Sequence, residues 1–252
     1  MGLLWLLLYG GLSALGLGSL LIAVELLRPR RRTFASALAK NLPTDPGQLG
    51  WTFEETQFVF SDGSNTPGWV IQGKKADGPV VVVCHGWGEG RYDVLPRLHP
   101  VVALASRIVV YDQRGHGESE AKLSRLGTWE VRDLRCVVDQ VGERLGTHQP
   151  IVLLGYSMGA GVVIQFVAGL PDATEHQGNQ PIINAVVVEG SCPKLSIALA
   201  GILRTLHFPP YPMAWIAPWL VIQPWGLGSG MDGSSHDHPQ AALPVISTAW
   251  HA

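Results

Sequence analysis

An apolar stretch that runs into a Gly-x-Ser-x-Gly pentapeptide constrains this chain most. Residues 151–154 (Ile-Val-Leu-Leu) have the composition of a buried β-strand, and Gly155-Tyr-Ser-Met-Gly159 follows them directly. A helical pattern starts at once, so the turn must be sharp and its neighbours must be small. The free N–H groups and the positive dipole end of the new helix would then point at the Ser157 hydroxyl. The pattern predicts a nucleophile at Ser157; the plainer interpretation is a glycine-rich junction that merely packs tightly.

The rest of the chain alternates between predicted strands and predicted helices. The predicted strands are 51–60, 68–72, 80–84, 107–112, 151–155 and 183–188. Most of them are unbroken apolar runs without a period of two, as in parallel strands that are buried on both faces. Helices are predicted at about 94–105, at 128–146 and after Ser157. This order predicts an α/β fold with a doubly wound, mostly parallel sheet.

The N-terminus has the composition of a membrane-spanning helix. Leu3 to Val24 contains no charged residue, and its roughly 22 positions are enough to cross a bilayer. Glu25 ends the run, and a cluster of arginines follows: Arg28, Arg30, Arg31 and Arg32. We therefore expect a transmembrane helix at 1–27, a basic juxtamembrane linker at 28–50, and a single-pass protein whose catalytic body is cytoplasmic. A cleaved signal peptide is the alternative, although its positive charge would precede the apolar stretch.

Two glycine-rich loops follow predicted strands. One is His85-Gly-Trp-Gly-Glu-Gly90, and the other is Asp112-Gln-Arg-Gly-His-Gly-Glu-Ser119. Loops at the carboxyl edge of a parallel sheet face ligands, and glycines let backbone N–H groups turn inward. The three motifs HGxxxG, DxRGHGxS and GxSxG stand in the order and spacing of the α/β-hydrolase family. The chain resembles that family over about residues 51–192, closest to its membrane-anchored, serine-aminopeptidase-like branch.

The resemblance implies roles for particular residues. Ser157 would be the nucleophile, and the backbone N–H groups of Trp87 and Met158 would form the oxyanion hole. Asp112 and Arg114 would hold loops by hydrogen bonds rather than take part in chemistry. His85 would brace its loop, with a role as the catalytic base as the weaker alternative. Neither a metal nor an organic cofactor is expected.

The triad histidine and acid are not identified by the sequence. A serine hydroxyl needs a histidine to accept its proton and a carboxylate to orient that histidine. In the family these residues follow two further strands after 183–188, and those strands are not evident here. The candidates considered late in the chain are Glu189 at the end of its strand and Asp232, His236, Asp237, His238 and His251 in the tail. A metal site at 236–238 is disfavoured, because a Gly/Ser-rich tail offers its ligands no rigid support.

The carboxyl-terminal part departs from the family pattern. We expect the hydrolase core at 51–193, a cap-like helical segment rich in Pro and Trp at 194–228, and a Gly/Ser-rich tail at 229–252 in which 243–246 starts the next strand. Three explanations stay open: the carboxyl-terminal part is missing, the chain is a degenerate member, or the tail supplies an unusual triad. A chain without its triad histidine is expected to be nearly inactive and poorly soluble.

The predicted function is that of a serine hydrolase which cleaves an ester, thioester or amide bond through an acyl-enzyme on Ser157. Its expected partners are a small-molecule acyl or peptide-like substrate and a membrane, which it contacts through 3–27. A net charge of −2 and a pI near 6.5 argue against nucleic acid. The rival hypothesis is a catalytically impaired, membrane-anchored pseudoenzyme or binding protein of the same fold.

Overall fold

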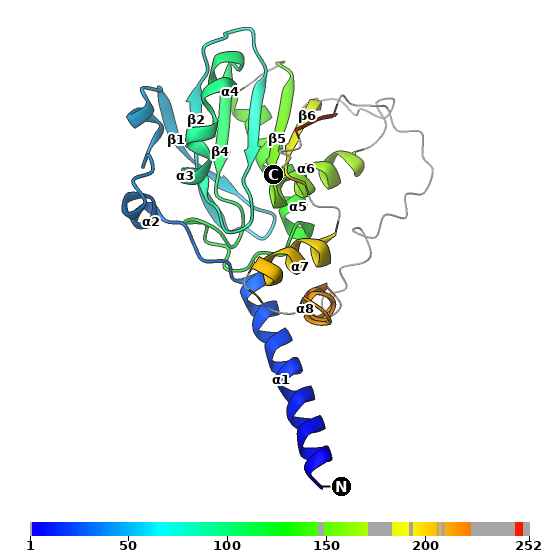
Figure 1. The fold of residues 1–252 in the computed structure, drawn as a ribbon. Helices are drawn as coiled ribbons and strands as arrows, with labels where there is room; N and C mark the ends of the chain where they lie inside the picture. The colour runs from blue at the N-terminus through cyan, green and yellow to red at the C-terminus, as the bar shows by residue number, and fades with distance from the viewer. Residues whose placement is uncertain are drawn as a thin grey trace. The chain divides into compact units, whose positions relative to one another are not determined.

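A mixed sheet forms the centre of the part that contains Ser157 (Figure 1). The computed structural model describes residues 2–145, 149–170, 183–191, 194–205, 207, 210–222 and 245–248. Within them the strands are β1 (Phe53–Val59), β2 (Asn65–Gln72), β3 (Val80–Cys84), β4 (Arg107–Tyr111), β5 (Ile151–Tyr156), β6 (Ile183–Glu189) and β7 (Val245–Thr248). Their order across the sheet is β1-β2-β4-β3-β5-β6-β7.

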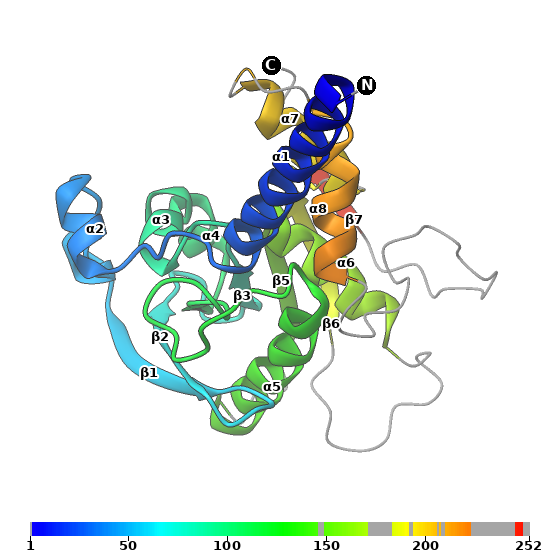
Figure 2. The same cartoon turned by 90° about the horizontal axis from the view of Figure 1, so that it is seen from below.

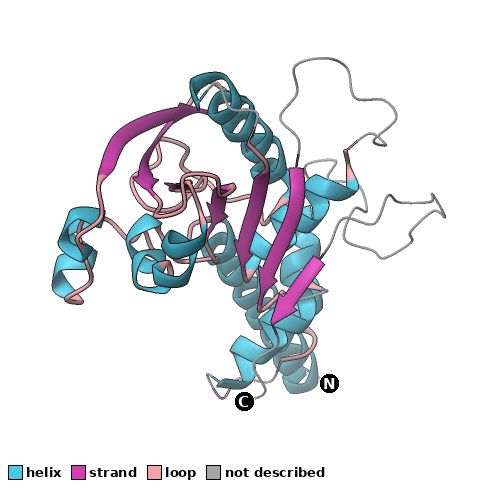
Figure 3. Cartoon of the chain, turned by 90° about the horizontal axis from the view of Figure 1, so that it is seen from above, coloured by secondary structure: helices cyan, strands magenta, loops and turns pink. Residues whose placement is uncertain are grey.

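The sheet is antiparallel at one side and parallel elsewhere. β1 pairs with β2 and β2 with β4 in antiparallel fashion, whereas the remaining neighbours run parallel (Figure 3). In register, Val82 faces Val109 on one side and Leu153 on the other. The carboxyl ends of β3, β4, β5 and β6 therefore meet at a single edge. The predicted α/β fold with a mostly parallel sheet is confirmed, and β7 supplies the strand expected to start near residue 243.

The helices of this part are mostly those that the sequence predicts. They are α2 (Phe34–Ala39), α3 (Arg91–Val94), α4 (His99–Leu104), α5 (Thr128–Leu145) and α6 (Met158–Ala168), with short 3₁₀ turns η1 (Pro46–Leu49) and η2 (Leu95–Arg97). The single helix expected at about 94–105 is instead divided into α3, η2 and α4. Pro96 and Pro100 explain the division, because each stands in the first turn of a new short helix. Proline lacks an N–H, and in the first turn of a helix that N–H would have no partner within the helix.

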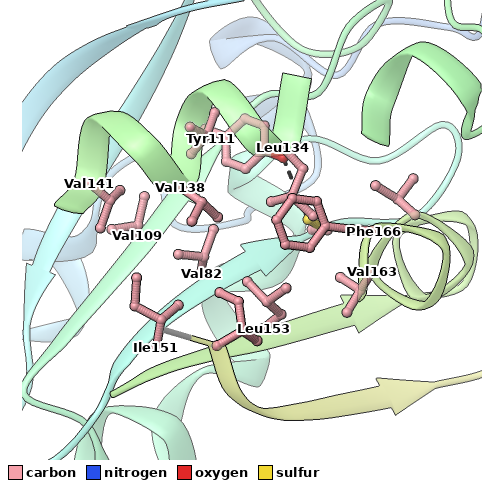
Figure 4. Packing of buried hydrophobic residues seen from close by; sticks show 14 of the residues in the cluster. Val82, Val109, Tyr111, Leu134, Val138, Val141, Ile151, Leu153, Val163 and Phe166 are labelled. Atoms are coloured by element: carbon pink, nitrogen blue, oxygen red, sulfur yellow. Dashed lines mark hydrogen bonds between the residues drawn. The ribbon is translucent and has the colours of Figure 1, made fainter. Parts of the chain in front are cut away.

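Apolar side chains fill both faces of the sheet. On one face Val82, Val109 and Leu153 pack against α5 and α6, as Figure 4 shows. Their neighbours along the strands point to the other face, where they join the residues of α3, η2 and α4. Burying one such side chain stabilises the fold by about 1.5–3 kcal/mol. This two-sided core explains why the strands carry unbroken apolar runs rather than alternation.

The N-terminal helix and two later helices form a separate compact unit. They are α1 (Gly2–Leu27), α7 (Leu195–Thr205) and α8 (Met213–Ile222). α8 packs along α1 (Figure 2), and a Cβ added at Gly18 would lie 3.1 Å from the Met213 methyl carbon. By length and composition α1 can cross a membrane, and most of its leucines are exposed.

Candidate active site

Ser157 lies at the turn that joins β5 to α6. Its backbone has φ 51° and ψ −111°, a conformation that costs a residue with a Cβ about 1–3 kcal/mol. The Ser157 N–H donates to the Glu189 carbonyl at 2.8 Å, and the Ser157 carbonyl accepts from the Ala160 N–H at 3.1 Å. The side chain is exposed. The turn thus holds an accessible serine in a strained conformation at the residue just before α6.

The two glycines of the pentapeptide make this turn possible. A Cβ at Gly155 would lie 2.6 Å from the Ala160 Cα, and one at Gly159 would overlap the carbonyl oxygen of Cys84. Real Cβ atoms do not approach other atoms so closely, so side chains are excluded at both positions. The start of α6 is therefore packed directly against the end of β3, which brings the loop after β3 to Ser157.

That loop, residues 85–90, is called the first glycine loop below. A Cβ at Gly86 would lie 3.3 Å from the Ser157 Cβ, so the backbone of the loop runs beside the nucleophile candidate. Trp87 is the next residue in the loop, and Met158 is the first residue of α6. The structure thus places the two predicted oxyanion-hole residues in the two backbone segments that meet at Ser157.

A carboxylate within the first glycine loop fixes its backbone. Glu89 Oε2 accepts the Gly86 N–H at 2.8 Å and pairs with Arg97 at 2.9 Å. Burial acts to raise the pKa of Glu89, but the Gly86 N–H and Arg97 outweigh it, so the pKa lies below its ordinary value. The Arg97 guanidinium also lies 4.1 Å from the centre of the Tyr156 ring. The sequence did not lead us to predict this cluster, although a charged residue within a glycine-rich loop and another shortly after it are a usable signal.

His85 braces the loop and is not placed to act as the base. Its Nε2 accepts the Gln113 N–H at 3.0 Å, which leaves the proton on Nδ1, where it is donated to the Gly86 carbonyl at 2.8 Å. Burial lowers the pKa of His85 to about 4. A fully buried imidazole with both nitrogens engaged cannot exchange a proton with Ser157.

Residues 112–119, the second glycine loop, are held by buried charges. Asp112 accepts the backbone N–H groups of Arg91 at 2.7 Å and Glu118 at 2.9 Å, and it also pairs with the Arg91 guanidinium. Arg114 pairs with Asp133 at 2.5 Å and with Asp62 at 3.1 Å. These contacts agree with the expectation that Asp112 and Arg114 hold loops.

The described residues do not contain a triad histidine in contact with Ser157. Their histidines are His85, His99, His116 and His207, and none of these hydrogen-bonds to Ser157. Glu189 contacts Ser157 through its backbone carbonyl. The remaining candidates, Asp232, His236, Asp237, His238 and His251, lie outside the described residues. Within the described part, no group of three or more His, Cys, Asp or Glu side chains is arranged to hold a metal ion.

Comparison with known proteins identifies the family. Residues 79–199, which include the first glycine loop, the second glycine loop and Ser157, match the family model of the alpha/beta hydrolase fold. This segment belongs to the α/β-hydrolase family. Its fold is similar to that of the Pyrococcus furiosus esterase Pf2001, with a TM-score of 0.59 at 20% identity over 77% of this chain and 67% of that one.

Three curated proteins match part of the chain. The uncharacterized protein YqkD of Bacillus subtilis is 31% identical over 111 residues, which cover 42% of this chain and 35% of that protein. A monoglyceride lipase of Mus musculus is 35% identical, covering 36% and 31%, respectively. A monoacylglycerol lipase of Mycolicibacterium smegmatis is 32% identical and covers 42% of each chain. The chain therefore spans about a third to two fifths of the length of these relatives.

Proposed function

We propose that this α/β-hydrolase is a serine hydrolase that cleaves carboxylic esters through an acyl-enzyme on Ser157. The observation that carries the proposal is the exposed Ser157 at φ 51° and ψ −111°, between the end of β5 and the start of α6 and beside Gly86. A strained, accessible serine at this junction is the geometry of a nucleophile elbow. A serine that merely packed a junction would have no reason to hold this conformation.

The proposed reaction uses the two backbone segments that flank Ser157, namely the first glycine loop and the start of α6. Ser157 Oγ attacks the ester carbonyl, its proton passes to a base, and the carbonyl oxygen becomes an oxyanion. We assign the N–H groups of Trp87 and Met158 to that oxyanion, because the loop after β3 and the start of α6 flank the serine. The bond to the alcohol then breaks with return of the proton, and water releases the acid by the same steps in reverse. The base is to be sought among His236, His238 and His251.

An acyl ester of a small alcohol is the substrate class we favour. The support comes from the relatives, since two of them are named as lipases of monoacylglycerols and the similar structure is named as an esterase. Thioesters and amides are cleaved by the same chemistry and are the next classes to assay.

We further propose that α1 anchors the protein as a single membrane span with the body on the cytoplasmic side. Its 26 residues are long and apolar enough, and the cluster that begins at Arg28 follows the span. Reporter domains fused after residue 252 test this orientation. A reporter that works only in the cytoplasm is expected; one that works only outside it would overturn the assignment, and cleavage after the apolar stretch would identify a signal peptide.

The activity is tested with the full chain purified in detergent. Aryl esters of short and long acyl chains are assayed beside a Ser157→Ala variant, which keeps the Cβ and the backbone conformation. We expect kcat/KM to fall about 10³-fold or more in the variant, because the covalent step is lost while substrate binding remains. Equal rates in the two proteins would contradict the proposal and favour a binding role. If turnover is found, substitution of His236, His238 and His251 in turn identifies the base.

A further inference from the structure

The four arginines after α1 are not equivalent in the structure. Arg28 and Arg30 are exposed. Arg31 and Arg32 are half-buried and extend onto loops of the hydrolase core. A positive-inside signal requires only charge near the end of the span, so it does not explain the specific contacts of the second pair. The Arg32 contacts lie on the loop that runs beside Ser157, whereas the Arg31 contacts lie at the end of the second glycine loop.

Arg32 binds the first glycine loop. Its Nε–H donates to the Gly88 carbonyl at 2.8 Å, and its Nη1 forms an ion pair with Asp93 at 2.9 Å. Asp93 accepts the Gly90 N–H at 3.0 Å with its other oxygen, so the pair holds the loop at two points. A Cβ at Gly90 would lie 3.0 Å from the Arg32 carbonyl oxygen. The backbone of Arg32 is thus also packed against the loop.

Arg31 binds a different segment, the end of the second glycine loop. Its two terminal nitrogens donate to the carbonyls of Ser119 at 2.8 Å and Ala121 at 2.6 Å, at the end of the second glycine loop. Next to it, the Phe34 N–H donates to Glu118 at 3.1 Å. Neighbouring arginines therefore hold different loops, which separates their expected effects on catalysis.

The contact at Gly88 lies next to the predicted oxyanion donor. The Trp87 N–H belongs to the peptide between Gly86 and Trp87. On its N-terminal side the Gly86 N–H is bound by Glu89, and on its C-terminal side the Gly88 carbonyl is bound by Arg32. Charge-assisted hydrogen bonds of this kind are about twice as strong as neutral ones. These two contacts therefore restrain the loop on both sides of the Trp87 N–H.

We propose that Arg32 is a positioning residue that orients the Trp87 N–H toward the oxyanion, so that the segment linking α1 to the core is part of the active-site scaffold. This inference rests on the proposed function, because the oxyanion hole has meaning only for acyl transfer. Arg32 itself touches no reacting atom. It acts through the Gly88 carbonyl and through Asp93, and its loss would loosen the loop without removing a catalytic group.

The test compares charge-matched variants of the full chain. Arg32→Gln is expected to lower kcat about 10- to 100-fold with KM within about twofold, since misplacement of a reacting group by about 1 Å has an effect of that size. Arg30→Gln removes the same charge from an exposed position of the same segment and should leave kcat unchanged. Arg31→Gln should lower the melting temperature and leave kcat within about twofold. Arg32→Lys keeps a charge near Asp93 but has no Nε–H for Gly88, so it should fall between wild type and Arg32→Gln.

Two further readouts separate positioning from stability. Affinity for a trifluoromethyl ketone, which forms an oxyanion on reaction with Ser157, should fall in Arg32→Gln by the same factor as kcat/KM. Amide hydrogen exchange should become faster at residues 86–90 in Arg32→Gln and at 116–121 in Arg31→Gln. Unchanged exchange at 86–90, faster exchange with unchanged kcat, or an equal loss of kcat in Arg31→Gln would each overturn the inference. A wild type whose turnover does not depend on Ser157 would instead contradict the proposed function, while hydrogen exchange still decides whether Arg32 holds the loop.

Discussion

The first and second glycine loops have similar sequences but different surroundings. Each follows a strand of the central sheet, and each contains a buried histidine next to a glycine, His85 in one and His116 in the other. The first loop runs beside Ser157, and its charged groups bind backbone N–H and carbonyl groups. The second loop is held by Asp112, which binds the Arg91 guanidinium and two backbone N–H groups, and by Arg114, which pairs with Asp133 and Asp62. The position of a loop relative to β5, rather than its composition, decides whether it borders the reaction site.

The largest effect on stability is expected in the second loop. Asp112→Ala would leave the Arg91 guanidinium, which is 8% exposed, without its most buried partner. The free energy of unfolding should fall by about 3–5 kcal/mol, as for other buried ion pairs from which one member is removed. Chemical denaturation measures this, with the exposed Asp77→Ala as the control. A loss below about 1 kcal/mol would show that the charges of this loop do not hold it.

Acidification should act on the two buried histidines. Burial lowers the pKa of His85 to about 4 and that of His116 to about 3. Their neutral forms therefore favour the folded state above the unfolded-state pKa near 6.5, and this contribution is lost as the pH falls toward 4. Each of the two histidines should lower the unfolding free energy by roughly 2–3 kcal/mol over this range. The slope should be smaller in His116→Gln; an identical slope would exclude His116 as a source.

A methyl group in the first loop should affect activity more than stability. In Gly86→Ala the new Cβ would lie 3.0 Å from Glu89 Oε2 and 3.3 Å from the Ser157 Cβ, so the loop must shift by a few tenths of an ångström. We expect kcat/KM to fall about tenfold while unfolding free energy changes by less than about 1 kcal/mol. Gly161→Ala is the control, because nothing lies within 4 Å of its added Cβ. The opposite pattern, a large loss of stability with full activity, would refute the distinction between the loops.

The smallest expected effect reports the strain at the turn after β5. Ser157→Gly should raise the unfolding free energy by about 1 kcal/mol, because glycine adopts a positive φ without the clash of a Cβ. Ser157→Ala keeps the Cβ and should leave stability near that of wild type. Thermal and chemical unfolding of the two variants compare them directly. Equal stabilities would mean that the turn stores no strain.

Much of the fold follows from local sequence pattern. The unbroken apolar runs specify the buried parallel strands, and the helical period at 128–146 specifies α5. The pattern could not show that Pro96 and Pro100 divide the helix after the first loop into short pieces. It also could not show the full length of the pairing between β1 and β2, since β2 begins at Asn65, three residues before the strand predicted at 68–72.

The candidate site was less predictable than the fold. Short motifs identify Ser157, Trp87 and Met158, because the local backbone geometry requires the glycines of these motifs. No local motif predicts a contact between residues that are distant in sequence, such as the hydrogen bond between Arg32 and Gly88, which are 56 positions apart. The arginines after α1 have a sufficient explanation in membrane topology, and only the structure separates the exposed pair from the pair that binds the loops.

The central claim is that the turn after β5 presents Ser157 as an activated nucleophile beside the first glycine loop. Reaction of the folded full chain with a fluorophosphonate probe, followed by mass spectrometry of the peptides, tests it most directly, because the probe labels only a serine whose hydroxyl is activated. We predict a single modified peptide that contains Ser157, and loss of labelling both in Ser157→Ala and after heat denaturation. Absence of label on Ser157 in the folded protein, or label that is equal after denaturation, would contradict the claim.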